Sequence, residues 1–188
     1  MKISETCQIA LDRLSWLEKN SSSTSSTQSY LTIDPAPALT STNIDELKEI
    51  LLDENRSLFE RYRAMFALRN IGTDEAVLAI CEGFQCSSAL FRHEVAFVLG
   101  QLQSICSIPA LYQQLAITSE NYMVRHECAE TLGSIGTQEC REILEKYLHD
   151  QERVVRESCE VALDISDYVN SGDFQYCNGL KLVESECC

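Results

Sequence analysis

The sequence predicts an all-α protein, a solenoid of stacked helical hairpins, and two patterns support this fold class. Four segments align without gaps, each beginning with Arg and ending with Leu, and their starts lie about 31 to 33 residues apart. This spacing is typical of helical-hairpin repeats. Amphipathic stretches with apolar residues at i, i+3 and i+4 separate the segments, as expected of helices with one buried face. The aligned segments are Arg61–Leu68, Arg92–Leu99, Arg125–Leu132 and Arg156–Leu163.

Each repeat is expected to contain an outer helix, a short turn and an inner helix, with the aligned segments forming the inner helices. Gly72 and Gly136 follow two inner helices at the same place, where Gly often closes a helix C-terminus. Because the period is short for HEAT units and the TPR and ankyrin signatures are absent, we classify the array as a short HEAT-like α-α superhelix. The outer stretches contain Ile44-Leu47-Ile50-Leu51, Val77-Ile80-Phe84, Ile108-Leu111-Leu115 and Ile143-Leu144-Tyr147-Leu148.

The four repeats are expected to occupy residues 43–167 and to be followed by a C-terminal tail at 168–188. Residues 20–42 are rich in Ser, Thr and Pro, which predicts a linker. The Arg residues that open the four aligned segments are expected to form a ladder between repeats with Glu or Asp.

Residues 1–19 are similar to the last inner helix. The string Ile3–Asp12 mirrors Val155–Asp164 in its apolar, acidic and cysteine positions. We therefore expect the chain to begin with the remnant last helix of a missing first half. Such a helix would expose an apolar face, including Trp16 and Leu17, where terminal repeats normally carry a polar cap.

Composition and charge exclude several classes of function. The formal net charge of −14 argues against nucleic acid binding and favours a basic partner or substrate. No apolar run is long enough to span a bilayer, and no secretory signal follows Met1. Most of the ten cysteines fall at apolar positions of helical patterns, which indicates a reduced, cytoplasmic chain. Cys187-Cys188 lack the order of a prenylation signal and are interpreted as part of a solvated tail.

Two of the three histidines stand in the same two-residue word, His-Glu, in successive repeats. The words are His93-Glu94 and His126-Glu127. Equivalent positions of a repeat lie on one face of the stack, so two imidazoles and two carboxylates are expected on one surface. Packed helices have axes about 8–10 Å apart, so both imidazoles are expected to reach a shared metal with bonds of about 2 Å.

The spacing leaves the roles of the two carboxylates open. Consecutive helical residues point about 100° apart, so one Glu is expected to ligate and the other to orient an imidazole or reach a second metal. Two His and one carboxylate are typical of non-haem Fe(II) sites that activate oxygen. Repeat duplication also copies inert residues, which leaves a structural role open. The other two repeats carry Tyr62-Arg63 and Glu157-Ser158 in this slot, so the His-Glu word is not simply the repeat consensus.

Four longer words surround these slots: Leu58–Asn70, Ser88–Val95, Met123–Glu130 and Glu152–Cys159. With Asp173–Tyr176 near the end, they resemble deoxyhypusine hydroxylase, a HEAT-repeat di-iron monooxygenase. The resemblance implies two pseudo-symmetric halves, each with two His-Glu words, and two irons (Fe²⁺) between them that activate dioxygen. It implies that this chain corresponds to the C-terminal half.

By this resemblance the expected iron ligands are His93, Glu94, His126 and Glu127, with Glu127 ahead of Glu94 as a direct ligand. No catalytic residue separate from the metal ligands is expected. The implied reaction is hydroxylation of the deoxyhypusine residue of the translation initiation factor 5A precursor, the step that gives hypusine. The acidic balance of the chain suits this cationic side chain.

Because the resemblance covers one half of the family's site, two hypotheses follow. In the first, the chain is a deoxyhypusine monooxygenase that needs pairing, as a homodimer or with the missing half, since one half supplies ligands for about one iron. In the second, the chain is a truncated, non-catalytic HEAT-repeat module that binds the basic substrate loop or another partner.

Overall fold

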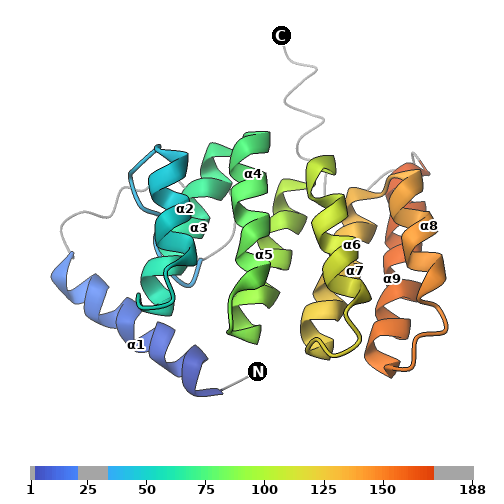
Figure 1. The fold of residues 1–188 in the computed structure, drawn as a ribbon, viewed down its shortest axis with the longest axis horizontal. Helices are drawn as coiled ribbons and strands as arrows, with labels where there is room; N and C mark the ends of the chain where they lie inside the picture. Colours follow the sequence, from blue (N-terminus) through green and yellow to red (C-terminus); the bar gives the residue numbers. More distant parts are fainter. Residues whose placement is uncertain (1–2, 21–33, 172–188) are drawn as a thin grey trace, which may run out of the picture.

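The computed structural model describes residues 3–20 and 34–171, and all regular structure in these ranges is helical (Figure 1). The predicted all-α, HEAT-like fold is confirmed. Much of the predicted linker and most of the predicted tail, with Asp173–Tyr176 and Cys187-Cys188, lie outside the described residues. The elements are α1 (Ile3–Lys19), α2 (Ile44–Leu52), α3 (Leu58–Ile71), α4 (Asp74–Cys81), η1 (Glu82–Gln85), α5 (Ala89–Leu102), η2 (Ile105–Ser107), α6 (Ile108–Ala116), α7 (Tyr122–Ile135), α8 (Gln138–Lys146) and α9 (Arg153–Asn170).

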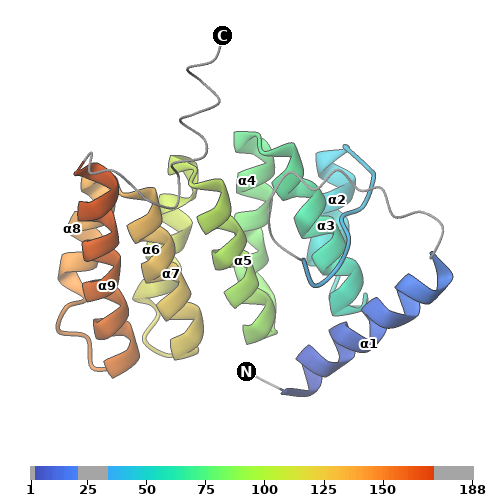
Figure 2. The same cartoon turned by 180° about the vertical axis from the view of Figure 1, so that it is seen from behind.

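The helices after α1 alternate between two layers. The inner layer contains α3, α5, α7 and α9, which contact one another in chain order, and the outer layer contains α2, α4, α6 and α8. Figures 1 and 2 view these layers from opposite sides. Equivalent residues of successive inner helices therefore come side by side. None of the described helices combines the length and apolar character needed to cross a membrane.

Short polar residues begin the helices, and left-handed residues end three inner ones. The side chains of Ser57 and Ser88 accept a hydrogen bond from a backbone N–H in the first turn of α3 and of α5. Gly72 and Gly136 close α3 and α7 with φ of 68° and 69°, as the sequence predicts. At the same place after α5, Gln103 adopts φ of 50°.

Small residues set the spacing of the inner helices. A Cβ atom added to Gly133 of α7 would lie 2.6 Å from the carbonyl oxygen and 2.7 Å from the Cα atom of Ala162 in α9. A Cβ atom on Gly100 of α5 would lie 2.9 Å from the Oγ1 atom of Thr131 in α7. The hydroxyl of Thr131 in turn donates to the carbonyl of Ala96 at 2.8 Å. Neighbouring inner helices therefore pack almost backbone to backbone.

The Arg residues that open the inner segments alternate between two roles. Arg61 and Arg125 are buried, and each donates from Nε to the last turn of the preceding outer helix, at 2.8 Å. Arg92 and Arg156 instead donate to loop carbonyls five and six residues earlier. The predicted acidic ladder forms in two of the four repeats, through Arg92–Glu120 and Arg125–Asp150, each 2.6 Å. In the first repeat, Arg61 contacts the Sγ atom of Cys86 where an acid was expected, at 2.5 Å.

A segment beginning at Asp34 fastens the inner layer to α1. The carboxylate of Asp34 accepts two hydrogen bonds from the buried Arg69 of α3, at 2.8 and 2.6 Å. Arg69 also donates to Gln101 of α5, at 2.9 Å. From α1, Arg13 donates to the backbone carbonyl of Asp34, at 2.7 Å. The described end of the predicted linker is therefore bonded directly to α1 and α3, and through Arg69 it is connected to α5.

The first helix exposes an apolar stripe whose counterparts in α9 are buried. Ile3 is 82% exposed, whereas its counterpart Val155 is buried. The prediction of an exposed face is correct for Leu17. It is wrong for Trp16, which is half-buried beneath the guanidinium of Arg63. The interpretation of residues 1–19 as the end of another array stays a prediction, as does the division into 20–42, 43–167 and 168–188.

We expect Gly133→Ala to lower the free energy of unfolding by about 1–3 kcal/mol or more, because the new methyl group meets the backbone of Ala162. Chemical denaturation measures this change. The matched control is Gly100→Ala, whose methyl group meets a side-chain hydroxyl that can give way, so its cost should be smaller. An equal or larger cost at Gly100 would contradict the proposed backbone contact.

We expect Asp150→Asn to cost about 1.5–3 kcal/mol at neutral pH, because it removes the charged partner of Arg125. Hydrogen bonds from Arg125 hold the pKa of Asp150 below its usual value. A carboxylate with a depressed pKa stabilises the fold above its unfolded pKa and loses that effect as the pH falls through its folded pKa.

The difference between the wild-type chain and Asp150→Asn should therefore stay constant from pH 7 to about pH 5 and shrink as the pH falls below about 4, as urea denaturation at several pH values would measure. Asp167→Asn is the matched control, since Asp167 pairs with Arg141 on the surface, where solvent screens the pair, and its loss should cost much less. A cost for Asp150→Asn that is independent of pH would count against the ion pair.

Candidate metal centre

The two His-Glu words lie at the same height on neighbouring inner helices. Each word begins five residues after the helix N-cap, which is Ser88 in α5 and Asn121 in α7. Because the caps fix where each helix starts, they also fix the height of His93 and His126 along the inner layer. Both imidazoles are about one-fifth exposed, so they face a partly open surface.

Glu127 stands between the two imidazoles. Its Oε2 atom lies 3.2 Å from Nε2 of His93 and 3.9 Å from Nε2 of His126. Ligand atoms bound to one ion at about 2.0–2.2 Å lie roughly 3–4 Å apart, so these separations fit a shared cation. Two imidazoles and one carboxylate are also the donor set that the sequence predicts. The arrangement is a possible His/Glu metal site.

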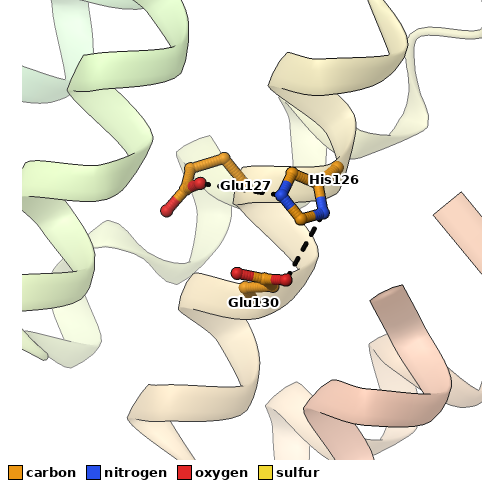
Figure 3. Close-up of side chains that lie close together, drawn as sticks. All are labelled: His126, Glu127 and Glu130. Atoms are coloured by element: carbon orange, nitrogen blue, oxygen red, sulfur yellow. Dashed lines mark ion pairs between the residues drawn. The ribbon is translucent and has the colours of Figure 1, made fainter. Parts of the chain in front are cut away.

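Glu130 lies at the other edge of the same imidazole. Its Oε1 atom is 3.4 Å from Nδ1 of His126, whereas Glu127 faces Nε2 (Figure 3). Among the described residues, His126, Glu127 and Glu130 form the one group whose possible ligand atoms all lie within 4.8 Å of one another. Glu127 and Glu130 nevertheless lie nearest to different nitrogens of His126, Nε2 and Nδ1 respectively. Nε2 is the better candidate for the metal-binding nitrogen of His126, because Nε2 of His93 faces the same oxygen of Glu127.

Glu94 is close to the centre but outside that group. Burial raises the pKa of Glu94 to about 7, opposed by His93 and increased by the charge of Glu127. Burial alone would lower the pKa of His93, but the hydrogen bond and charge of Glu127, with Glu94 and Glu130, raise it overall. Both shifts therefore arise from carboxylates gathered around partly buried groups.

The structure brings together three of the four predicted ligands, His93, His126 and Glu127, and leaves Glu94 beside them. That any of the four binds metal stays a prediction. Sequence reasoning missed Glu130, although its position four residues after His126 places it on the same helix face. It also missed Ser158 of α9, whose Oγ atom lies 2.7 Å from Nδ1 of His126.

We expect Glu127→Gln to lower the pKa of His93 in the metal-free protein. The substitution removes the negative charge that raises this pKa and leaves the burial that lowers it. An NMR titration of the imidazole signals measures the shift. Glu130→Gln is the matched control and should lower the pKa less, because Glu130 is the weaker of the two influences. Equal shifts in the two variants would contradict the central position of Glu127.

Comparisons with known proteins agree with this architecture. Residues 78–164 match a family model described as HEAT repeats, and residues 60–86 match one described as a PBS lyase HEAT-like repeat. Deoxyhypusine hydroxylase of Danio rerio is 55% identical over 98% of this chain and 62% of its own length. The Mus musculus enzyme is 54% identical over 96% of this chain and 60% of its own length.

A solved structure of human deoxyhypusine hydroxylase in complex with glycerol superposes with a TM-score of 0.83 at 55% identity, covering 87% of this chain and 57% of that one. The chain thus spans about three fifths of the length of the curated relatives it matches. Over nearly all of its own length, this chain is similar in sequence and in HEAT-repeat fold to the deoxyhypusine hydroxylases.

Proposed function

We propose that this chain provides one half of the centre of an iron-dependent deoxyhypusine monooxygenase. The substrate is the deoxyhypusine residue of the translation initiation factor 5A precursor, and the co-substrate is dioxygen. The observation that carries the proposal is the position of Glu127 between His93 and His126, contributed by adjacent inner helices. The relatives' name, deoxyhypusine hydroxylase, supports the choice of reaction.

His93, His126 and Glu127 would hold iron, which when bound supplies the activation of dioxygen. Glu94 is proposed as the fourth residue of the centre. Burial raises the pKa of Glu94 to about 7, so its carboxyl group can hold a proton near neutral pH. It therefore suits holding a proton or a cationic group better than a solvated carboxylate does. The net charge of −14 would attract a basic substrate segment to this surface.

The complete centre is proposed to form when two such arrays face each other. The described residues offer two imidazoles with one central carboxylate, which suffices for about one ion. A second copy of the chain, or a companion half, would supply the matching set. Isologous pairing would place two equivalent surfaces opposite each other.

We expect His93→Ala and His126→Ala each to weaken Fe²⁺ binding by at least about 100-fold, because each removes a ligand. Anaerobic titration with Fe²⁺, followed by elemental analysis of each species separated by size, measures affinity and stoichiometry. The matched control is His149→Ala, which changes the third histidine, an exposed residue after α8. Iron binding that survives both substitutions at the centre would contradict the site.

The activity assay uses the same preparations with the deoxyhypusine-bearing precursor and dioxygen, and mass spectrometry detects the added oxygen atom. We expect product from assemblies that hold two irons per pair of facing arrays. Paired chains that bind both irons and never form product would contradict the monooxygenase and favour the non-catalytic module. Precursor binding that is unchanged in both histidine variants would be the signature of that module.

A further inference from the structure

The fourth repeat contributes to the centre although it lacks a His-Glu word. Its slot reads Glu157-Ser158, and Ser158 lies on α9, next to α7. The Oγ atom of Ser158 lies 2.7 Å from Nδ1 of His126. Ser158 is 6% exposed, so water competes little for this contact.

The direction of this hydrogen bond follows from a second one. The hydroxyl of Ser158 donates to the backbone carbonyl of Val154, one turn earlier in α9, at 2.8 Å. A serine hydroxyl has one proton to donate. With that proton on the Val154 carbonyl, Ser158 accepts from His126. The Nδ1 atom of His126 is therefore the one that carries hydrogen, and a neutral ring then has its lone pair on Nε2.

We propose that Ser158 is a positioning residue that fixes the tautomer and ring orientation of His126, so that Nε2 presents its lone pair toward Glu127. The inference rests on the proposed function for its purpose, which is to prepare His126 as a metal ligand. Ligating histidines commonly donate their second N–H to a fixed acceptor, and such partners matter for affinity.

Two features of the fold hold the acceptor in place. Ser158 sits one helical turn before Ala162, the residue against which Gly133 packs, so α9 cannot move away without opening that contact. The bond to Val154 fixes the rotamer of the hydroxyl. Glu130 also faces Nδ1, but at 3.4 Å and with 39% of its side chain exposed. The Glu130 carboxylate also favours hydrogen on Nδ1, but it orients the ring less firmly than the buried hydroxyl of Ser158 does.

The test compares Ser158→Ala with Ser158→Thr, which restores a hydroxyl, in ¹⁵N-histidine-labelled protein. Long-range ¹H–¹⁵N correlation spectra of the metal-free chain, recorded where the rings are neutral, report which nitrogen carries hydrogen. We expect His126 to be protonated on Nδ1 in the wild-type chain and in Ser158→Thr. In Ser158→Ala we expect a mixture of tautomers and Fe²⁺ binding about 10–100-fold weaker.

Ser107→Ala is the matched control. Ser107 is also buried, and its hydroxyl donates to a backbone carbonyl, that of Ser104, at 2.7 Å, but it belongs to η2. This variant should leave both readouts unchanged, and thermal unfolding of all variants identifies a general loss of stability.

A wild-type ring protonated on Nε2 would overturn the inference, as would Ser158→Ala with the wild-type tautomer and wild-type Fe²⁺ affinity. Failure of the proposed function looks different. A wild-type chain that binds no Fe²⁺ contradicts that function, while the tautomers of the metal-free wild-type and variant chains still decide the role of Ser158.

Discussion

The close approach of neighbouring inner helices is the constraint on which the rest of the structure depends. Where Gly133 meets Ala162, there is no room for even one additional methyl group. Where Gly100 meets Thr131, a methyl group would press on the hydroxyl that bonds the carbonyl of Ala96. Close-packed interiors transmit such contacts rather than absorb them. The separation of α5, α7 and α9 is therefore fixed by residues that carry no chemistry themselves.

This spacing determines which side chains meet, and they meet across repeats. The His of one repeat contacts the second residue of the slot in the next repeat, as in His93 with Glu127 and His126 with Ser158. In the first repeat, Tyr62 occupies the His position, and the charge of Glu94 in the next repeat raises its pKa further, beyond the effect of burial. The two residues of the second His-Glu word thus make their shortest contacts with different repeats, although Glu127 also lies 3.9 Å from Nε2 of His126 in its own word.

The repeat pattern was sufficient to predict the fold. Helical periodicity located the inner and outer layers, and the Gly residues that end α3 and α7 were predicted from their place in the repeat. For the centre, the sequence predicted which residue types gather and on which surface. Spacing alone left open which Glu lies between the imidazoles, because that depends on the stagger between neighbouring helices, and only the family resemblance favoured Glu127 over Glu94.

Two other features were beyond the sequence for the same reason. Ser158 gave no signal, since a serine in a helix has no pattern that marks it as the acceptor for an imidazole two helices earlier along the chain. The attachment of Asp34 to Arg69 gave none either, because composition predicts a linker wherever Ser, Thr and Pro are frequent. In both cases the partners are more than thirty residues apart and are brought together only by packing.

The electrostatics of the centre argue against the alternative in which the two His-Glu words are inert surface residues copied by repeat duplication. An inert surface pair would keep its carboxylates solvated, at little cost. Here Glu127 is buried, and burial raises the pKa of Glu94 to about 7. The pKa of His93 is raised as well, despite its burial. Both shifts mean that the folded chain binds protons more tightly where its carboxylates gather. A bound cation would neutralise the same carboxylates and release those protons. Keeping this charge partly out of water is unfavourable for folding, which supports the proposed cation site over a purely structural role.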